Sequence, residues 1–316
     1  MLKNPFNAVS PEQAAALSAK KPSLPFNPSP LISKHPKEGR LLPVEPLKVF
    51  DNVWWMGSKA VGAIVIDSGE GYLMIDSGSN DEEAAWIQES YKKMGLDPSM
   101  IQLIVISHEH FDHYGGLPYF KKEVCPKAYT AMSRTGWNLL QTVPTEFAFT
   151  QPRPESIDIM IDDGLCLKLG NTELLCVSTP GHSAGCVSFI FNSSLHGKEL
   201  SVGVMGGSAV WPDFPEARMY ESSIEYFRLY TDLLECNAFT AVHQPEEELD
   251  RVRAHWNASA VHPWVCPEEE FDQAYLQGFR DRVQSAVYGG KMLPYVMPDG
   301  RPEGSPLPER KYRFFM

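Results

Sequence analysis

The sequence predicts an α/β fold in which two β-sheets are packed between outer helices. Short runs rich in β-branched and aromatic residues, broken by glycine and serine, begin at Leu47 and recur along the chain. Amphipathic helical patterns separate some of these runs, and both halves of the chain contain strand-like runs and helical patterns. Each sheet and each helix must bury an apolar surface, so this order favours two sheets with helices outside them.

The order of elements in the first half is strands, helix, strand. The strand-like runs are VWWMGS (53–58), GAIVIDSG (62–69), GYLMIDSG (71–78) and IQLIVIS (101–107). Before the last of them, residues 81–95 place Ala84, Ile87, Tyr91 and Met94 on one helical face. Gly95 is a typical helix stop, so this segment is predicted to be a helix.

The second half contains further strand-like runs and two helical patterns. The strand-like runs are 174–179, 187–191, 201–207 and 238–243. One helix is predicted from about Ser223 to Leu234 and another from about Glu268 to Val287. The second has an apolar residue every fourth position, which is typical of a stripe packed on a core.

The two ends of the chain differ in composition from its middle. Residues 1–45 are rich in Pro, Lys and Ser, with one short helical signal at Ser10–Leu17. This arm is interpreted as lying on the domain or on a neighbouring subunit, which would make the protein a homo-oligomer. Residues 46–287 are predicted to form one domain, and the Pro- and Gly-rich residues 288–316 an irregular surface tail.

Charge and cysteine usage exclude several classes of protein. The net charge of the 316 residues is -12, so the overall field repels nucleic acid and anionic lipid. No secretory signal and no run of eighteen apolar residues occur, which predicts a cytoplasmic protein without membrane contacts. The six cysteines lack CxxC spacing, which argues against a disulfide scaffold and a zinc finger.

Three histidines and one aspartate lie within six positions directly after the predicted strand at 101–107: His108, His110, Asp112 and His113. A loop leaving a strand end can point alternate side chains into one cleft. His108 and His110 can then bind one metal ion, while Asp112 and His113 turn toward a second. Imidazole and carboxylate suit Zn²⁺ when a coordination position must stay open for water, although iron or manganese can use the same ligands.

This segment resembles the H-x-H-x-D-H signature of the metallo-β-lactamase superfamily, and the resemblance extends from about Leu47 to Val287. It implies a catalytic domain with the four-layer αβ/βα sandwich of that fold. It also implies two Zn²⁺ per chain, the first bound by His108, His110 and His182 of the TPGH segment. The second would be bound by Asp112, His113 and His243. Asp76 is similar to the family's carboxylate beneath the metal loop, which orients ligands without binding metal.

Ser208 departs from the commoner family pattern. Many superfamily hydrolases, including glyoxalase-type thioesterases, have an Asp at this position that bridges both metals, and one class of zinc β-lactamases has a Cys. The serine is similar to the third subclass of zinc β-lactamases, which implies that Ser208 contacts substrate or water. Cys236 and Cys266 stand much as that subclass's disulfide does; two unrelated buried thiols are the equal alternative.

The resemblance implies a hydrolase that uses a metal-bound hydroxide to cleave a small-molecule C–N or C–O acyl bond, in a lactam (cyclic amide) or a lactone. Asp112 would handle the proton. Substrate would be chosen by Ser208 and by aromatic residues of the segments 132–155 and 210–220, among them Trp137 and Trp211, for which plain packing is at least as good an interpretation.

Other functions remain open at this point. An acyl-thioester hydrolase is the nearest alternative, because the metal site alone does not choose among acyl substrates. A diiron oxidoreductase is a second, although no flavin-type domain is visible. A nuclease is disfavoured by the acidic charge, and a binding-only role by the complete ligand set.

Overall fold

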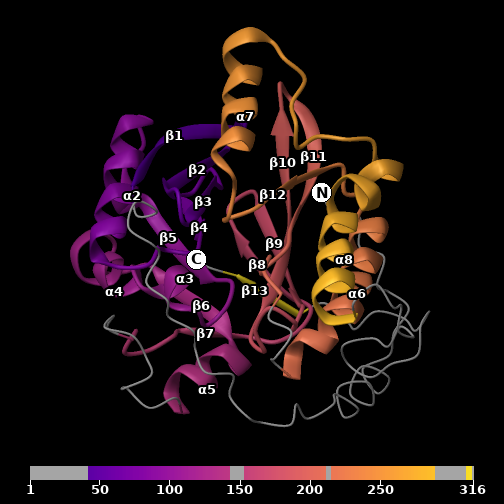
Figure 1. The fold of residues 1–316 in the computed structure, drawn as a ribbon. Helices are drawn as coiled ribbons and strands as arrows, with labels where there is room; N and C mark the ends of the chain where they lie inside the picture. The colour runs from indigo at the N-terminus through magenta and orange to yellow at the C-terminus, as the bar shows by residue number, and fades with distance from the viewer. Residues whose placement is uncertain (1–41, 143–152, 211–214, 289–310, 315–316) are drawn as a thin grey trace.

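Two β-sheets form the centre of the structure, a computed structural model that describes residues 42–142, 153–210, 215–288 and 311–314. The sheets lie face to face with helices on their outer sides, as Figure 1 shows with α2 and α4 on one side and α6 and α8 on the other. The α/β architecture of two sheets and outer helices is therefore confirmed.

The first sheet has seven strands in the order of the sequence. They are β1 (Pro43–Phe50), β2 (Val53–Ser58), β3 (Gly62–Asp67), β4 (Tyr72–Ile75), β5 (Ile101–Ile106), β6 (Tyr129–Ser133) and β7 (Ile159–Ile161). β1 to β4 form an antiparallel meander, and β4 to β7 pair in parallel. The carboxyl ends of β4 and β5 therefore open at the same edge of the sheet.

The second sheet has six strands in the order β12-β11-β10-β9-β8-β13. Their bounds are β8 (Leu165–Leu169), β9 (Thr172–Ser178), β10 (Val187–Leu195), β11 (Lys198–Val204), β12 (Ala238–Thr240) and β13 (Lys311–Phe314). β8 to β11 are antiparallel neighbours, whereas β12 and β13 pair in parallel with β11 and β8.

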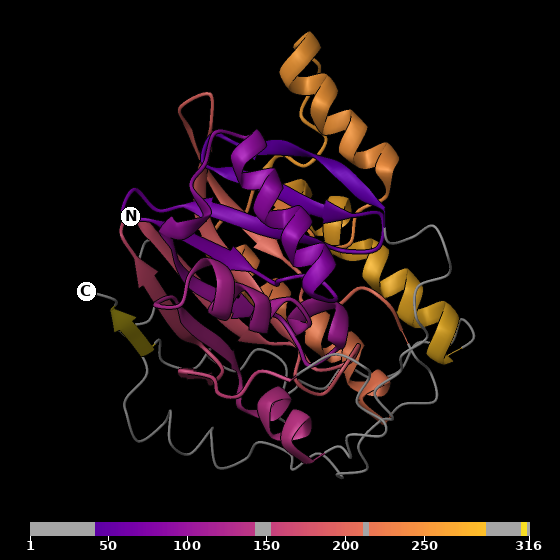
Figure 2. The ribbon, with the colours of Figure 1, turned by 90° about the vertical axis from the view of Figure 1, so that its left-hand side faces the viewer.

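The helical elements lie mostly outside the two sheets. They are α2 (Asp81–Lys93), η1 (Pro98–Met100), α3 (Phe111–Tyr114), α4 (Leu117–Tyr119), η2 (Phe120–Val124), α5 (Arg134–Thr142), η3 (Pro215–Met219), α6 (Tyr220–Leu233), α7 (Glu246–Ala258), η4 (Glu268–Glu270), η5 (Asp272–Leu276), α8 (Gln277–Val283) and η6 (Gln284–Tyr288). Figure 2 shows α2 lying across the outer face of the first sheet. Within the described residues, no helix has the length and apolar character needed to cross a membrane.

Three hydrophobic clusters hold the layers together. Strand β3 shows the principle, because Ile64 and Ile66 point between the sheets while Ala63 and Val65 point toward α2. The second sheet likewise packs Val177 and Ile190 against the tyrosine-rich face of α6 and against α8. Burying one large aliphatic side chain contributes about 1.5–3 kcal/mol, so these doubly covered sheets dominate the stability.

The predicted strands and helices agree with the structure within a few residues wherever both can be compared. The predicted domain start at 46 lies inside β1, which begins at Pro43. The helix predicted at 81–95 is α2, where Asn80 accepts a hydrogen bond from the backbone N–H of Glu83 and caps the first turn. The predicted helix at 268–287 is a helical stretch in which short 3₁₀ and π turns flank α8.

Two predictions about chain segments are wrong. The tail 288–316 is not wholly irregular, because residues 311–314 form β13. The edge strand β8 has backbone N–H and C=O groups that need partners. An extended segment can form these hydrogen bonds even when the residues around it are rich in Pro and Gly. The segment 132–155, predicted to contribute aromatic residues beside the cleft, is not a simple loop, because it includes the end of β6 and the whole of α5. The helical signal at Ser10–Leu17 and the arm 1–45 up to residue 41 lie outside the described residues.

Candidate metal centre

Loops from both sheets meet at one end of the sandwich and carry the predicted ligands. After β5 the chain turns through residues 107–110 into α3, which brings in four of them. The loop between β9 and β10 carries His182, and the turn after β12 carries His243. The structure thus brings together all six residues that the resemblance assigned to metal.

The first group consists of His108, His110 and His182. The His110 Nδ1 atom lies 3.1 Å from His108 Nε2 and 3.0 Å from His182 Nε2. Three ring nitrogens facing one point at this spacing could bind one metal ion and would leave a coordination position open.

The second group consists of Asp112, His113 and His243. The Nε2 atoms of the two histidines are 3.2 Å apart, and Asp112 Oδ2 lies 3.7 Å from His113 Nε2 and 3.6 Å from His243 Nε2. Two imidazoles and one carboxylate again leave coordination positions free for water or substrate.

The outward ring nitrogens of these histidines are fixed by hydrogen bonds. His182 Nδ1 lies 2.8 Å from the carbonyl oxygen of Ala209, and His243 Nδ1 lies 2.8 Å from that of Ala60. A carbonyl can only accept, so Nδ1 carries the proton in both rings and Nε2 presents its lone pair to the site. This is the arrangement that holds metal-binding histidines in position.

Asp76 ties the β5 loop to its sheet. Its carboxylate accepts hydrogen bonds from the backbone N–H of Ser107 at 2.7 Å and from the Ser107 hydroxyl at 2.8 Å, and it lies 2.6 Å from His113 Nδ1. The residue is fully buried and holds a left-handed backbone with φ 63°, a conformation that costs a non-glycine residue energy. The predicted orienting role matches these contacts.

Electrostatics favour the protonation states that a metal requires. Burial lowers the pKa of His108 and His182 well below the usual histidine value and that of His110 to about 4, so these rings are neutral at pH 7. Burial opposes ionisation of Asp112, but the neighbouring His113 and His243 outweigh it and lower the Asp112 pKa to about 2. The aspartate is therefore a carboxylate at neutral pH.

Glu109 points away from the metal groups and joins the two ligand loops. Its buried carboxylate accepts a hydrogen bond from the Ser183 hydroxyl at 3.0 Å and from the backbone N–H of Gly185 at 3.2 Å. Burial raises the pKa of Glu109 to about 7. A Cβ on Gly185 would lie 2.2 Å from this carboxylate, so only glycine fits there.

Ser208 stands beside the first group. A Cβ on the preceding Gly207 would lie 2.5 Å from the Cβ of His182, and the following Ala209 supplies the carbonyl that fixes the His182 ring. Tyr220, at the start of α6, donates a hydrogen bond to the Gly207 carbonyl. No sequence pattern predicts this contact, because nothing local to Tyr220 points to the loop it supports.

The other predicted pocket residues have different outcomes. Trp137 lies in α5 and packs, partly buried, against the cluster outside the first sheet. Its place in a substrate pocket stays a prediction. Trp211 lies outside the described residues. Cys236 and Cys266 are both free thiols in the structure.

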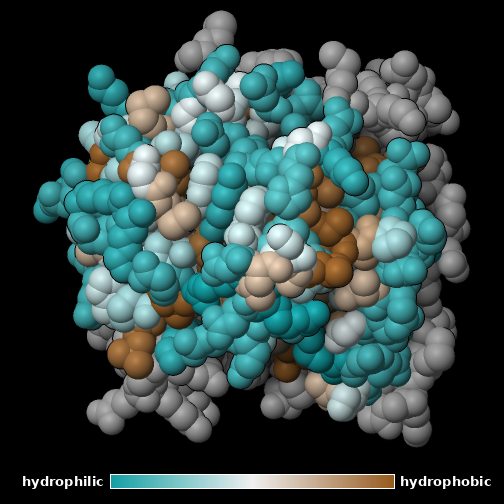
Figure 3. Space-filling model, turned by 90° about the horizontal axis from the view of Figure 1, so that it is seen from above, coloured by the Kyte–Doolittle hydropathy of each residue, from teal (hydrophilic) through white to brown (hydrophobic). Residues whose placement is uncertain are grey.

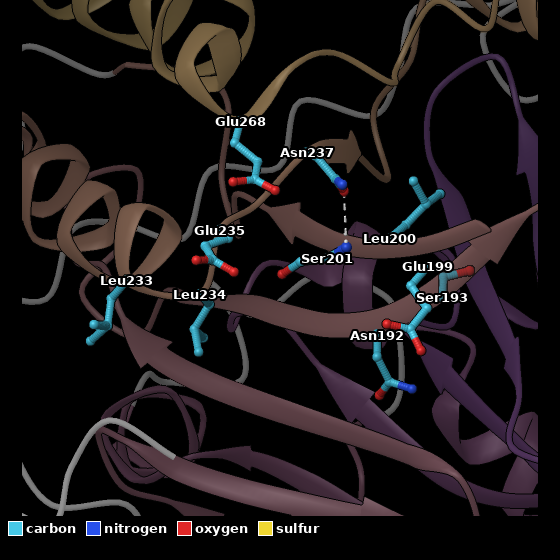
Figure 4. A pocket seen from close by; sticks show the side chains of 10 residues that line it. All are labelled: Asn192, Ser193, Glu199, Leu200, Ser201, Leu233, Leu234, Glu235, Asn237 and Glu268. Carbon is cyan, nitrogen blue, oxygen red and sulfur yellow. Dashed lines mark hydrogen bonds between the residues drawn. The ribbon is translucent and has the colours of Figure 1, made fainter. Parts of the chain in front are cut away.

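A cavity of ≈ 360 Å³ lies elsewhere, at the opposite ends of β10, β11 and β12 from the metal groups (Figure 4). Its lining includes Ser201 and Asn237, joined by a hydrogen bond of 3.0 Å from the Ser201 backbone N–H to Asn237 Oδ1, and three glutamates, Glu199, Glu235 and Glu268. None of the predicted site residues lines it, so it has no part in the metal centre.

Comparisons with known proteins agree with this geometry. Residues 59–194 match the metallo-beta-lactamase superfamily. Glyoxylase B2 of Dictyostelium discoideum is 27% identical over 165 residues, which are 49% of this chain and 50% of that protein. A hydroxyacylglutathione hydrolase of Buchnera aphidicola subsp. Baizongia pistaciae is 28% identical over 45% of this chain and 47% of its own length. The chain thus spans about half the length of these curated relatives.

Solved structures share the fold over a longer stretch. A subclass B3 metallo-beta-lactamase of Bradyrhizobium japonicum has a TM-score of 0.65 and 20% identity, covering 80% of this chain and 99% of that one. The native metallo-beta-lactamase of Legionella gormanii has a TM-score of 0.62 and 22% identity, covering 77% and 97%. The solved structures thus share the fold of this chain, and its residues 59–194 match the metallo-beta-lactamase superfamily.

Proposed function

We propose that this protein is a zinc-dependent hydrolase that cleaves an acyl bond of a small molecule, a lactam or a lactone. The observation that carries the proposal is the convergence of two three-residue ligand groups, with Asp112 as the one carboxylate among them. Residue 208 is a serine, which cannot bridge two metal ions as an aspartate could. Asp112 is then the only acidic residue of the two groups that can transfer protons.

The donor atoms fit Zn²⁺. Three neutral imidazoles in the first group and two imidazoles with a carboxylate in the second are common zinc ligand sets, and both leave an open position. Zinc bound there supplies Lewis acidity, which polarises an acyl carbonyl and lowers the pKa of a water molecule toward about 7.

The chain's own residues would orient the reacting groups and move the proton. The Asp112 carboxylate is partly exposed, ionised and part of the second group, so it can accept a proton from an attacking water and return it to the leaving nitrogen or oxygen. Ser208 lies between Gly207 and Ala209, which both lie against His182. At this position its hydroxyl can donate a hydrogen bond to a bound substrate or accept one from it.

An acyl-thioester hydrolase is the second candidate. The curated relatives support it, because two of them are named hydroxyacylglutathione hydrolase and such a substrate is an acyl thioester. Rates on matched panels of lactams, lactones and acyl thioesters test the two candidates against each other. A protein that turns over only thioesters would remove the lactam or lactone proposal and leave the hydrolase class standing.

We expect the purified protein to hold two tightly bound zinc ions per chain. Six ligand atoms in two groups of three predict this number, and elemental analysis after dialysis measures it. Chelation should abolish turnover, and added Zn²⁺ should restore it. Iron in place of zinc, with a redox-active absorption spectrum, would instead support the oxidoreductase alternative.

Ser208→Ala should leave the zinc content unchanged and alter KM or kcat modestly. A neutral hydroxyl is a poor zinc ligand beside imidazole and carboxylate, so its removal affects substrate contacts only. Ser99→Ala, at an exposed turn before β5, is the matched control for losing a hydroxyl. Loss of one zinc ion from the Ser208 variant would show that the serine belongs to the ligand set.

A further inference from the structure

A second pair of histidines lies far from the metal centre. His196 is at the tip of the β10–β11 hairpin, and His255 is near the end of α7. Both elements reach the upper part of the view in Figure 1. Their Nε2 atoms are 3.0 Å apart. The metal loops lie at the opposite ends of β10 and β11, so the pair is separate from the centre described above.

This pair repeats the geometry of a ligand pair within the metal centre. His113 and His243 also face each other through Nε2 atoms, at 3.2 Å. His255 Nδ1 lies 2.6 Å from the carbonyl oxygen of Ala260, as His243 Nδ1 lies against a carbonyl. Because that carbonyl can only accept, the proton of His255 is on Nδ1 and the lone pair of Nε2 faces His196.

The surroundings hold the two rings in place and leave one side open. His255 is 9% exposed and packs edge-on against Trp256 and His262, whereas His196 lies exposed on the surface. His262 cannot be a third ligand, because its Nε2 bonds to the Val49 carbonyl and its Nδ1 accepts from the Trp264 N–H. Water must therefore complete any coordination at this site.

The charges near the pair are balanced. The Asp51 carboxylate accepts hydrogen bonds from the backbone N–H groups of His196 and Gly197, and Lys48 lies over the ring of Trp256. Figure 3 looks down on this end of the molecule and shows a surface that is mostly hydrophilic. A hydrated cation at the pair thus does not meet an isolated positive charge.

We infer that His196 and His255 bind one further divalent transition-metal ion, with water in its remaining coordination positions. Two imidazoles suit Zn²⁺, Ni²⁺ and Cu²⁺. Two protein ligands give weaker binding than the three of each group at the centre. The occupancy of this site would therefore rise and fall with the surrounding metal concentration, while the central ions stay bound.

The hairpin provides a sharp variant for the test. His196 and Gly197 form a two-residue turn in which both have positive φ, 51° and 76°. Asn-Gly is the favoured pair for such a turn, so His196→Asn should fold at least as well as the wild type while losing the ring nitrogen. Lys198→Asn changes the same hairpin without removing a ligand and is the matched control.

The experiment is a calorimetric titration of Zn²⁺ into protein whose tight sites are already filled. We expect one additional, weaker binding event in the wild type and in Lys198→Asn, and an affinity at least tenfold lower in His196→Asn. The affinity of the tight events should not differ among the three proteins. The inference is overturned if the wild type shows no additional event, in which case the two rings share only a hydrogen bond. It is equally overturned if His196→Asn keeps the additional event, which would place the ion elsewhere.

Discussion

Asp112→Ala is expected to lower kcat by roughly 10²–10⁴-fold, the contribution of a positioned proton-transfer group, with a further loss from the weakened second metal site. The carboxylate is the sole acidic member of the two ligand groups, and it is ionised at neutral pH. Steady-state kinetics on the best substrate of the panel, with zinc counted in the same preparation, measures both effects.

A matched control separates this effect from a general loss of an aspartate. Asp97→Ala removes an exposed carboxylate that caps η1 at the opposite end of β5, and it should leave kcat within about twofold of the wild type. His182→Ala should also abolish most turnover, but through loss of the first zinc. Near-normal turnover in a folded Asp112→Ala protein would contradict the proposed proton handling.

Glu109→Ala is expected to weaken zinc binding and the fold together. Its removal leaves the Ser183 hydroxyl and the Gly185 N–H buried without their acceptor, at a cost of about 1–3 kcal/mol for each donor. The loop that carries His182 then loses its link to the loop that carries His108 and His110. Urea unfolding of the metal-free protein and zinc competition with a chromophoric chelator measure the two losses separately.

Glu109→Gln is the graded variant for this prediction. The amide keeps the size of the side chain and one acceptor oxygen, so it should retain part of both the stability and the zinc affinity. If Glu109→Ala binds zinc as tightly as the wild type while being less stable, the carboxylate supports the fold alone and does not position His182.

The sequence predicts the site best where the ligands are close together in the chain. His108, His110, Asp112 and His113 follow one strand, so strand-end geometry alone brings them together. His182 and His243 came only from the resemblance, since nothing local distinguishes them from ordinary strand-end histidines. The carbonyls of Ala60 and Ala209 could not be predicted, because any residue type has a backbone carbonyl.

The fold shows the same division between local and distant information. β2, β3 and β4 have strong alternating or apolar patterns, and their predicted bounds agree with the structure. α7 was not predicted, because its mostly charged sequence has a weak apolar stripe and only Leu249, Val252 and His255 are buried. β13 is defined by its pairing with β8, more than 140 residues away, and no local pattern records that partner.

The ligand groups draw on segments that are distant in the chain, and this links metal binding to the order of folding. His110 and His182 are separated by 72 residues, and His113 and His243 by 130. Neither group exists until the two sheets have docked, so an unfolded chain cannot present it. Ions that bind only the native state stabilise it by mass action, by about 4 kcal/mol at a thousandfold excess over Kd. Metal ions bound at the proposed centre would therefore hold the two docked sheets together reversibly, and their removal should lower the free energy of unfolding.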